Sequence, residues 1–194
     1  MYWVGALTVL LVAASGCSGN ARQTSAPSAA PRPGSVWVAE EGADSISVID
    51  LASQTVTETL KVGMRPRGLL LSSDNKLLYI CASDSDRVQV MDLATRKIIK
   101  ELPSGADPEQ FALHPNDRWL YISNEDDALV TVVDSQSDAV LAQIDVGVEP
   151  EGMAVSPDGK WAVNTSETTN MLHWIDTSTQ QLVAAERATT TALD

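Results

Sequence analysis

The side chains best able to do chemistry in this chain are acidic residues and two arginines that recur in predicted loops. One set directly precedes predicted strands, and the other lies between the second and third strands of a predicted repeat. We define the candidate binding face as Arg65, Arg67, Asp84, Asp86, Asp107, Glu109, Glu125, Asp126, Asp127, Glu149, Glu151 and Glu167, with Glu40 and Glu41 in the first of these loops. Such a face could bind a cation, a charged ligand or a protein partner.

The acidic loops lack the pattern of a dedicated metal site. Ca²⁺ takes several oxygen ligands, but Asp84-Ser85-Asp86 and Glu125-Asp126-Asp127 lack the spacing and the glycine of an EF-hand loop. A solvated acidic face that binds a partner, or that keeps the protein soluble, accounts for the same residues. We therefore predict no metal site.

No catalytic constellation is visible either. The only histidines, His114 and His173, fall on different predicted strands of different repeats, which favours structural roles over a catalytic dyad. The sequence has no G-x-S-x-G, no H-E-x-x-H and no phosphate-binding loop. It also has no C-x-x-C-H for covalently attached c-type haem. We predict no catalytic residues and no cofactor.

A repeated phrase positions these loops. Its copies start at residues 62, 104 and 146, 42 residues apart, and read VGMRPRGLLLSSDNK, SGADPEQFALHPNDR and VGVEPEGMAVSPDGK. Each unit contains four short predicted strands separated by turn signals. Apolar residues occupy both faces of the strands, as a sheet packed between two neighbours requires. Four-stranded units of this length are typical of propeller blades.

The predicted fold class is all-β, a β-propeller of four-stranded antiparallel blades over residues 35–194. About four blades are present, the first with only three strands because no inner strand is evident, so we expect an incomplete ring. The repeat register places Arg67, Glu109 and Glu151 at equivalent positions near the central axis. An aspartate ends each third strand and is expected to close the following turn by accepting hydrogen bonds.

Composition excludes several partners. The chain has 13 basic against 26 acidic residues and a net charge of −13. Nucleic-acid binding usually requires a basic patch, and an anionic membrane surface repels such a chain. We predict neither nucleic-acid binding nor membrane contact through the folded part.

The N-terminal segment predicts export. Residues 1–17 contain an apolar run of signal-peptide length, and Ala14-Ser15-Gly16-Cys17 resembles a bacterial lipobox with Cys17 as the lipidated residue. Plain signal cleavage nearby is the alternative. Residues 18–34 are a Ser/Ala/Pro linker. We expect a periplasmic protein anchored by lipid at the outer membrane, in which Cys81 is a small strand residue without a disulfide partner.

The repeat phrases carry a family resemblance. Leu78-Tyr79-Ile80, Leu120-Tyr121-Ile122-Ser123-Asn124 and the Val-Gly-x-x-Pro loops resemble YVTN-type propellers, which are YncE-like. CASDSDRVQV and NTSETTN look most like exported β-propeller proteins associated with PQQ-dependent catabolism. That resemblance implies a periplasmic accessory of quinoprotein dehydrogenase systems, and it supplies no catalytic residues.

The functional hypothesis is an exported, non-enzymatic binding or scaffold protein that acts beside PQQ-dependent alcohol oxidation, with a quinoprotein dehydrogenase as partner. Direct PQQ binding is not required by any residue. A propeller enzyme of lactonase type is the first alternative, and a non-functional fragment of a longer propeller is the second. A homodimer that completes the ring is a further expectation.

Overall fold

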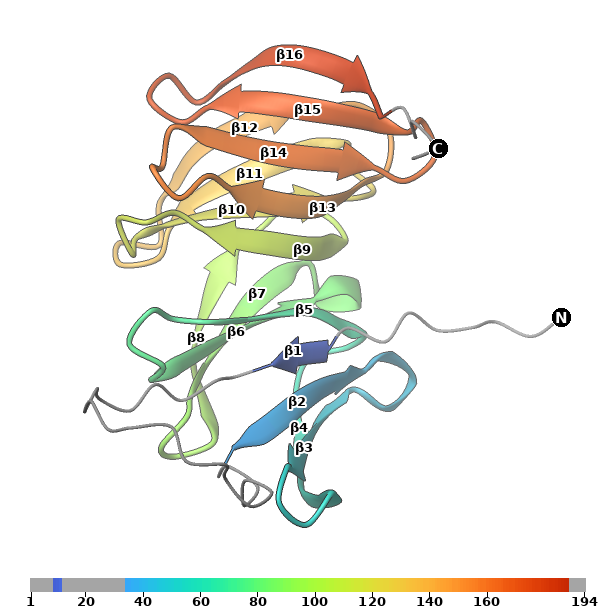
Figure 1. Cartoon of the computed structure of the whole chain (residues 1–194), viewed down its shortest axis with the longest axis vertical. Coiled ribbons are helices and arrows are strands. Elements are labelled where there is room, and N and C mark those ends of the chain that lie inside the picture. The colour runs from blue at the N-terminus through green and yellow to red at the C-terminus, as the bar shows by residue number, and fades with distance from the viewer. Residues whose placement is uncertain (1–8, 12–33, 189–194) are drawn as a thin grey trace, which may run out of the picture.

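The computed structural model describes residues 9–11 and 34–188, which form four antiparallel sheets of four strands each (Figure 1). The first blade contains β1 (Val9–Leu11), β2 (Ser35–Glu40), β3 (Ser45–Asp50) and β4 (Thr55–Lys61). The second contains β5 (Pro66–Leu71), β6 (Leu77–Ala82), β7 (Arg87–Asp92) and β8 (Lys97–Pro103). The third contains β9 (Pro108–Leu113), β10 (Trp119–Asn124), β11 (Leu129–Asp134) and β12 (Val140–Asp145). The fourth contains β13 (Pro150–Val155), β14 (Trp161–Ser166), β15 (Met171–Asp176) and β16 (Gln181–Arg187).

The blades stack face to face in chain order. The inner strand β9 contacts both β5 and β13, and β5 also contacts β2. Figure 1 shows the sheets rising in sequence from β2–β4 to β13–β16. The all-β propeller prediction is confirmed, and the four blades form an incomplete ring. The described residues contain two short 3-10 helices, η1 (Glu41–Ala43) and η2 (Ser83–Ser85), and no helix with the length and apolar character needed to cross a membrane.

The hydrophobic core lies between the sheets, in three layers. Ile46 and Leu78 are fully buried between the first and second blades, Ile122 between the second and third, and Val130 and Ile175 between the third and fourth. Both faces of the middle sheets are therefore buried, as the apolar residues on both faces of their strands predict.

The tight turns follow the repeat as well. Asp50 accepts hydrogen bonds from the backbone N–H and the hydroxyl of Ser53 at 2.7 and 2.8 Å, and Asp92 does the same for Thr95. This confirms the predicted role of the aspartate that ends each third strand. The same bonds lower the pKa of Asp50 and Asp92.

The first blade differs from its prediction. Val9–Leu11 pairs antiparallel with β2, with Leu10 opposite Trp37, and supplies the inner strand that the sequence reading omitted. The prediction of a three-stranded first blade is wrong because β2 otherwise presents an unpaired edge, and an apolar segment can satisfy its backbone groups. This strand lies inside the segment predicted as a signal peptide. The rest of that segment, Cys17 and residues 18–33 of the linker lie outside the described residues.

The outward face of the last sheet carries exposed apolar side chains. Trp161 is 39% exposed and Val183 is 53% exposed, and both line one surface cavity with Trp174. In the third blade Val132, at the repeat position of Trp174, is fully buried by the neighbouring sheet. The fourth blade thus presents a surface of the kind that the inner blades cover.

Candidate functional site

The loops before the inner strands hold the first set of candidate residues in a repeated backbone conformation. Arg65, Asp107 and Glu149 have φ angles of 48°, 50° and 50°, and the proline of the next inner strand follows each of them. Left-handed backbone is unfavourable for residues with a side chain. Its recurrence at three equivalent positions shows that this turn is a fixed part of each blade. The residue after the proline, which is Arg67, Glu109 or Glu151, is therefore held at the same place in each blade.

Arg67, from the second blade, contacts an acidic side chain of each of the other three blades. Its guanidinium pairs with Glu109 and also lies 3.3 Å from Glu151 and 3.8 Å from Glu41. The Glu109 side chain is only 1% exposed, whereas that of Glu151 is 32% exposed. Arg67, Glu109 and Glu151, which the repeat register places at equivalent positions, thus lie together in the structure.

Arg65 extends the same network. It lies 3.1 Å from Asp84, 3.2 Å from Asp107 and 3.0 Å from Glu109. Glu109 therefore pairs with both arginines, and its Oε1 accepts a hydrogen bond from Arg65 at 3.0 Å.

Glu109 is also the centre of an acidic trio. Oxygen atoms of Asp107, Glu109 and Glu125 lie within 4.8 Å of one another. Burial raises the pKa of Glu109 to about 9, with Arg67 opposing the rise and Glu125 and Asp107 adding to it. A hydrogen bond between the side chains of Glu109 and Glu125 favours the protonated form of Glu109. Because the two arginines already supply positive charge, we assign no metal ion to the trio.

A second group of carboxylates lies beside Glu151. Burial raises the pKa of Glu151, and the negative charges of Glu167, Glu125 and Glu149 raise it further. In the described part of the chain, Oε2 of Glu149 is buried without a hydrogen-bond partner. Around Glu151, the carboxylates therefore outnumber the arginine side chains that could neutralise them.

Of the remaining candidate residues, Asp86 and Asp127 accept hydrogen bonds from backbone N–H groups, and Asp126 lies outside the ion-pair network. Oδ1 of Asp86 accepts the N–H of Asp107 at 3.1 Å, and Oδ2 of Asp127 accepts the N–H of Ala106 at 2.6 Å. Asp126 is exposed and joins no ion pair among the described residues. The sequence reading missed Asp44, whose Oδ1 accepts the N–H of Arg65 at 3.0 Å. The sequence could have identified Asp44, because Asp44 and Arg65 have the same separation as Asp86 and Asp107.

The two histidines lie away from this network. Nε2 of His114 is 2.8 Å from the backbone oxygen of Gly159, in the turn between the first two strands of the next blade. Nδ1 of His173 is 3.3 Å from Oδ1 of Asn164, and burial lowers the pKa of His173. Each has a local structural partner, as expected.

Comparison with known proteins places the fold among propellers. A family model described as YNCE-like beta-propeller matches residues 1–126, and one described as cytochrome D1 heme domain matches residues 80–194. Among solved structures, Kuenenia stuttgartiensis hydrazine synthase is similar, with a TM-score of 0.72 and 22% identity over 87% of this chain and 52% of that chain. This chain thus spans about half the length of that protein, and the likeness shows the fold alone. No curated protein matches.

The match to the cytochrome D1 heme domain raises the question whether side chains of this protein could ligate a haem. Haem iron requires an axial ligand, commonly a histidine. Nε2 of His114 is engaged with Gly159, and His173 is only 5% exposed. Neither histidine lines the cavity at Tyr79, the one at Arg87 or the one at Trp174. Neither histidine is placed to ligate a haem iron, and we derive no chemistry through one.

Proposed function

This chain belongs to the YNCE-like beta-propeller family, and on that premise we propose that it is an exported, non-enzymatic binding protein that assists PQQ-dependent alcohol oxidation. Its ligand is a protein partner, a quinoprotein dehydrogenase, which docks on the acidic loop face. The resemblance of CASDSDRVQV and NTSETTN to PQQ-associated propellers supports the choice of partner. Export, the lipid anchor on Cys17 and a ring-completing homodimer stay predictions.

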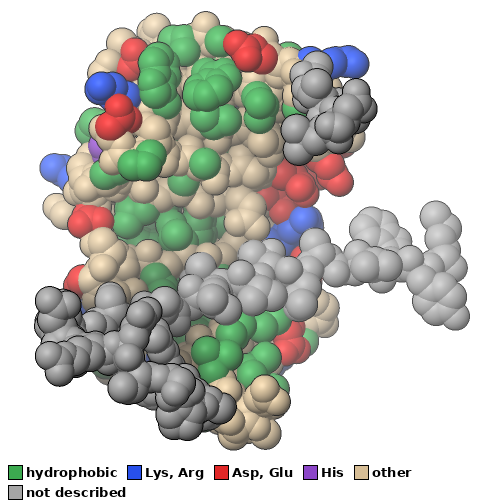
Figure 2. Space-filling model, in the orientation of Figure 1, with side chains coloured by type: hydrophobic (Ala, Val, Ile, Leu, Met, Phe, Trp, Pro, Cys, Tyr) green, Lys and Arg blue, Asp and Glu red, His purple; other side chains and the backbone are tan. Residues whose placement is uncertain are grey.

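The observation that carries this proposal is the unbalanced charge around Glu151. Burial raises the pKa of Glu151, the carboxylates of Glu167, Glu125 and Glu149 raise it further, and the charge of Arg67 lowers it. Figure 2 shows acidic side chains gathered beside a small basic group at one edge of the molecule. A surface with excess negative charge favours a basic surface on the partner and steers its approach.

The test uses a purified PQQ-dependent alcohol dehydrogenase and the full chain, with Kd measured by biolayer interferometry at low salt. The variant Glu149→Gln/Glu151→Gln/Glu167→Gln keeps the side-chain shapes and removes the charges. We expect its Kd to rise by about tenfold or more. The control Asp145→Asn/Glu186→Gln neutralises exposed acids outside the face and should leave Kd unchanged. Absence of saturable binding, or equal binding by all three proteins, contradicts the proposal.

A lactonase-type hydrolase is the second candidate, favoured by one observation. Glu151 has a raised pKa and a partly exposed side chain beside buried Glu109, which suits an acid or base. The binding role is preferred because neither of the two histidines joins this face. Lactone turnover that is lost in Glu151→Ala and Glu109→Ala would replace the first proposal with this one.

A further inference from the structure

A cavity of about 340 Å³ lies between the second and third blades, away from the acidic loop face. It is formed by the turns that follow the inner strands β5 and β9 and by the turn after β11. Because the strands of a blade are antiparallel, these turns lie at the opposite end of the sheets from the loops before β5 and β9. The lining residues are Ser72, Ser73, Asp74, Leu77, Tyr79, Leu113, Asp117, Ser135 and Gln136.

The repeat register explains why space exists here. At the next interface, between the third and fourth blades, His114 takes the place of Ser72 and Trp119 the place of Leu77. The rings of His114 and Trp119 pack with centroids 5.0 Å apart, and His114 reaches Gly159 across the interface. Serine and leucine are smaller than these rings, so the corresponding volume between the second and third blades is open.

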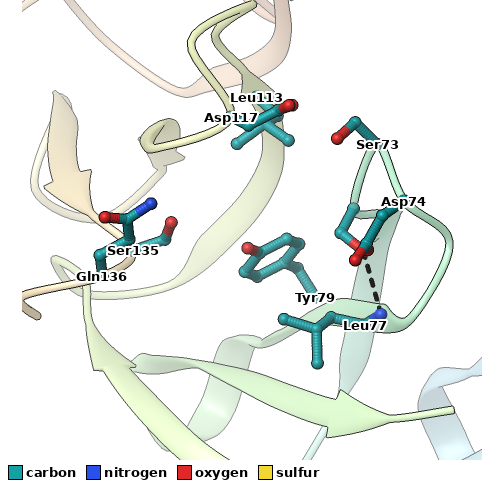
Figure 3. A pocket seen from close by; sticks show the side chains of 9 residues that line it. Ser73, Asp74, Leu77, Tyr79, Leu113, Asp117, Ser135 and Gln136 are labelled. Carbon is teal, nitrogen blue, oxygen red and sulfur yellow. Dashed lines mark hydrogen bonds between the residues drawn. The ribbon is translucent and has the colours of Figure 1, made fainter.

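Tyr79 lines this space and, although only 4% exposed, lacks the side-chain partner that its equivalents have. At the repeat position of Tyr79, the hydroxyl of Tyr121 donates to Gln180 at 3.0 Å, and the ring of Trp37 is covered by Arg96 at 4.7 Å. The residue corresponding to Gln180 and Arg96 is Asp138, which instead pairs with Lys100. Among the described residues no hydrogen bond involves the Tyr79 hydroxyl. Figure 3 shows Tyr79 with Leu113, Asp117, Ser73, Ser135 and Gln136 around it.

The lining combines apolar walls with a polar rim that contains no basic side chain. Leu77, Leu113 and the Tyr79 ring supply the apolar surface. Asp74 and Asp117 supply carboxylate acceptors, and Gln136 supplies an amide. The pKa of Asp74 is lowered to about 2 by hydrogen bonds from Lys76 and Ser72, so this acceptor is ionised at neutral pH. Asp74 is ion-paired with Lys76 at 2.9 Å, so Asp117 is the carboxylate that chiefly disfavours an anionic ligand. An inorganic cation gains nothing from leucine walls.

We propose that this cavity binds a small neutral polyhydroxylated molecule, a sugar or polyol of about monosaccharide size. Such a molecule places its C–H surface on Leu77, Leu113 and Tyr79 and donates its hydroxyls to the carboxylates. Its oxygen atoms accept hydrogen bonds from the Tyr79 hydroxyl and the Gln136 amide. The cavity lies at the lower end of the size range of ligand sites. The proposal does not depend on the acidic loop face.

The experiment titrates the full chain with D-glucose, myo-inositol and glycerol by isothermal titration calorimetry, with sodium sulfate as an anion control. We expect saturable binding of at least one polyol and none of sulfate. The variant Ser72→His/Leu77→Trp copies the filled interface of the next blade and should abolish binding while far-UV circular dichroism is unchanged.

A second variant tests the proposal even if Ser72→His/Leu77→Trp does not fold. Tyr79→Phe removes one hydroxyl and should weaken binding by about five- to tenfold, the worth of one hydrogen bond. The matched control Tyr121→Phe alters the equivalent hydroxyl outside the cavity and should bind as the wild type does. The proposal is overturned if no polyol binds, if sulfate binds instead, or if Tyr79→Phe and Tyr121→Phe bind equally.

Discussion

Arg67 pairs with Glu109, and the two residues occupy the same position of successive 42-residue repeats. The inner strand β5 therefore carries an arginine where the neighbouring inner strand β9 carries a glutamate. An exact repeat would place two identical side chains there. Glu151, the third member of this series, lies 3.3 Å from the same guanidinium. This difference between the repeats gives an ion-pair network in which Arg67 links the second blade with the third and the fourth.

Removal of Arg67 tests this link. Arg67→Ala leaves Glu109 and Glu151 without their shared donor, so we expect the free energy of unfolding to fall by about 1–3 kcal/mol. Urea denaturation followed by tryptophan fluorescence measures it. The matched control is Arg87→Ala, whose partner Glu101 is 43% exposed, with an expected loss of less than about 1 kcal/mol. Equal losses in the two variants would mean that the axial pair has no special weight.

The buried Glu109 predicts a pH dependence of stability. Its pKa is raised from 4.5 to about 9, so in this pH range the folded protein holds a proton that the unfolded chain releases. A raised carboxyl pKa contributes stability that is fully present below pH 4.5 and is lost as the pH rises toward 9. Glu109→Gln copies the protonated form, so wild type should lose stability relative to this variant with rising pH. Urea unfolding at several pH values measures the difference, and parallel curves for the two proteins would refute a raised pKa.

The loops between second and third strands predict a stabilising substitution. Asp44, Asp86, Ala128 and Asn170 share left-handed φ angles of 49° to 55°. Asp44 and Asp86 each accept a backbone N–H from the next blade, whereas the methyl side chain of Ala128 cannot accept a hydrogen bond. Asparagine tolerates this conformation and supplies an acceptor, so Ala128→Asn should stabilise by about 1 kcal/mol.

The same denaturation assay measures this effect, with Asp86→Ala as the reverse change. That variant loses the bond to Asp107 and should be destabilised by about 1 kcal/mol. An Ala128→Asn protein that unfolds at the wild-type urea concentration or below would show that the repeated bond adds no stability at this position.

Much of the fold was predictable because it depends on a strict repeat. The register alone brings Arg67, Glu109 and Glu151 together, since equivalent residues of stacked blades lie side by side. β1 was not predictable in the same way, because Val9–Leu11 belongs to an apolar segment with no repeat phrase, and its pairing is set by the open edge of β2.

The details of the site depended on side-chain geometry. Asp86 and Asp127 were predicted to face a ligand, yet each accepts a backbone N–H from a neighbouring loop. Acidic composition cannot distinguish these roles, because a carboxylate in a loop suits either. The cavity at Tyr79 follows from the size of Ser72 and Leu77 relative to His114 and Trp119. The sequence shows this difference in side-chain size, but it predicts a cavity only once the packing between the blades is known.

The most direct test of the proposed binding role is the salt dependence of the association rate constant with a purified PQQ-dependent alcohol dehydrogenase. Stopped-flow mixing of the full chain with the dehydrogenase would be measured over a range of NaCl concentrations. An acidic face that steers its partner predicts a rate constant that falls as salt rises, and a much weaker dependence for Glu149→Gln/Glu151→Gln/Glu167→Gln. A rate constant that is independent of salt, or equally salt-dependent in wild type and variant, would contradict docking on this face.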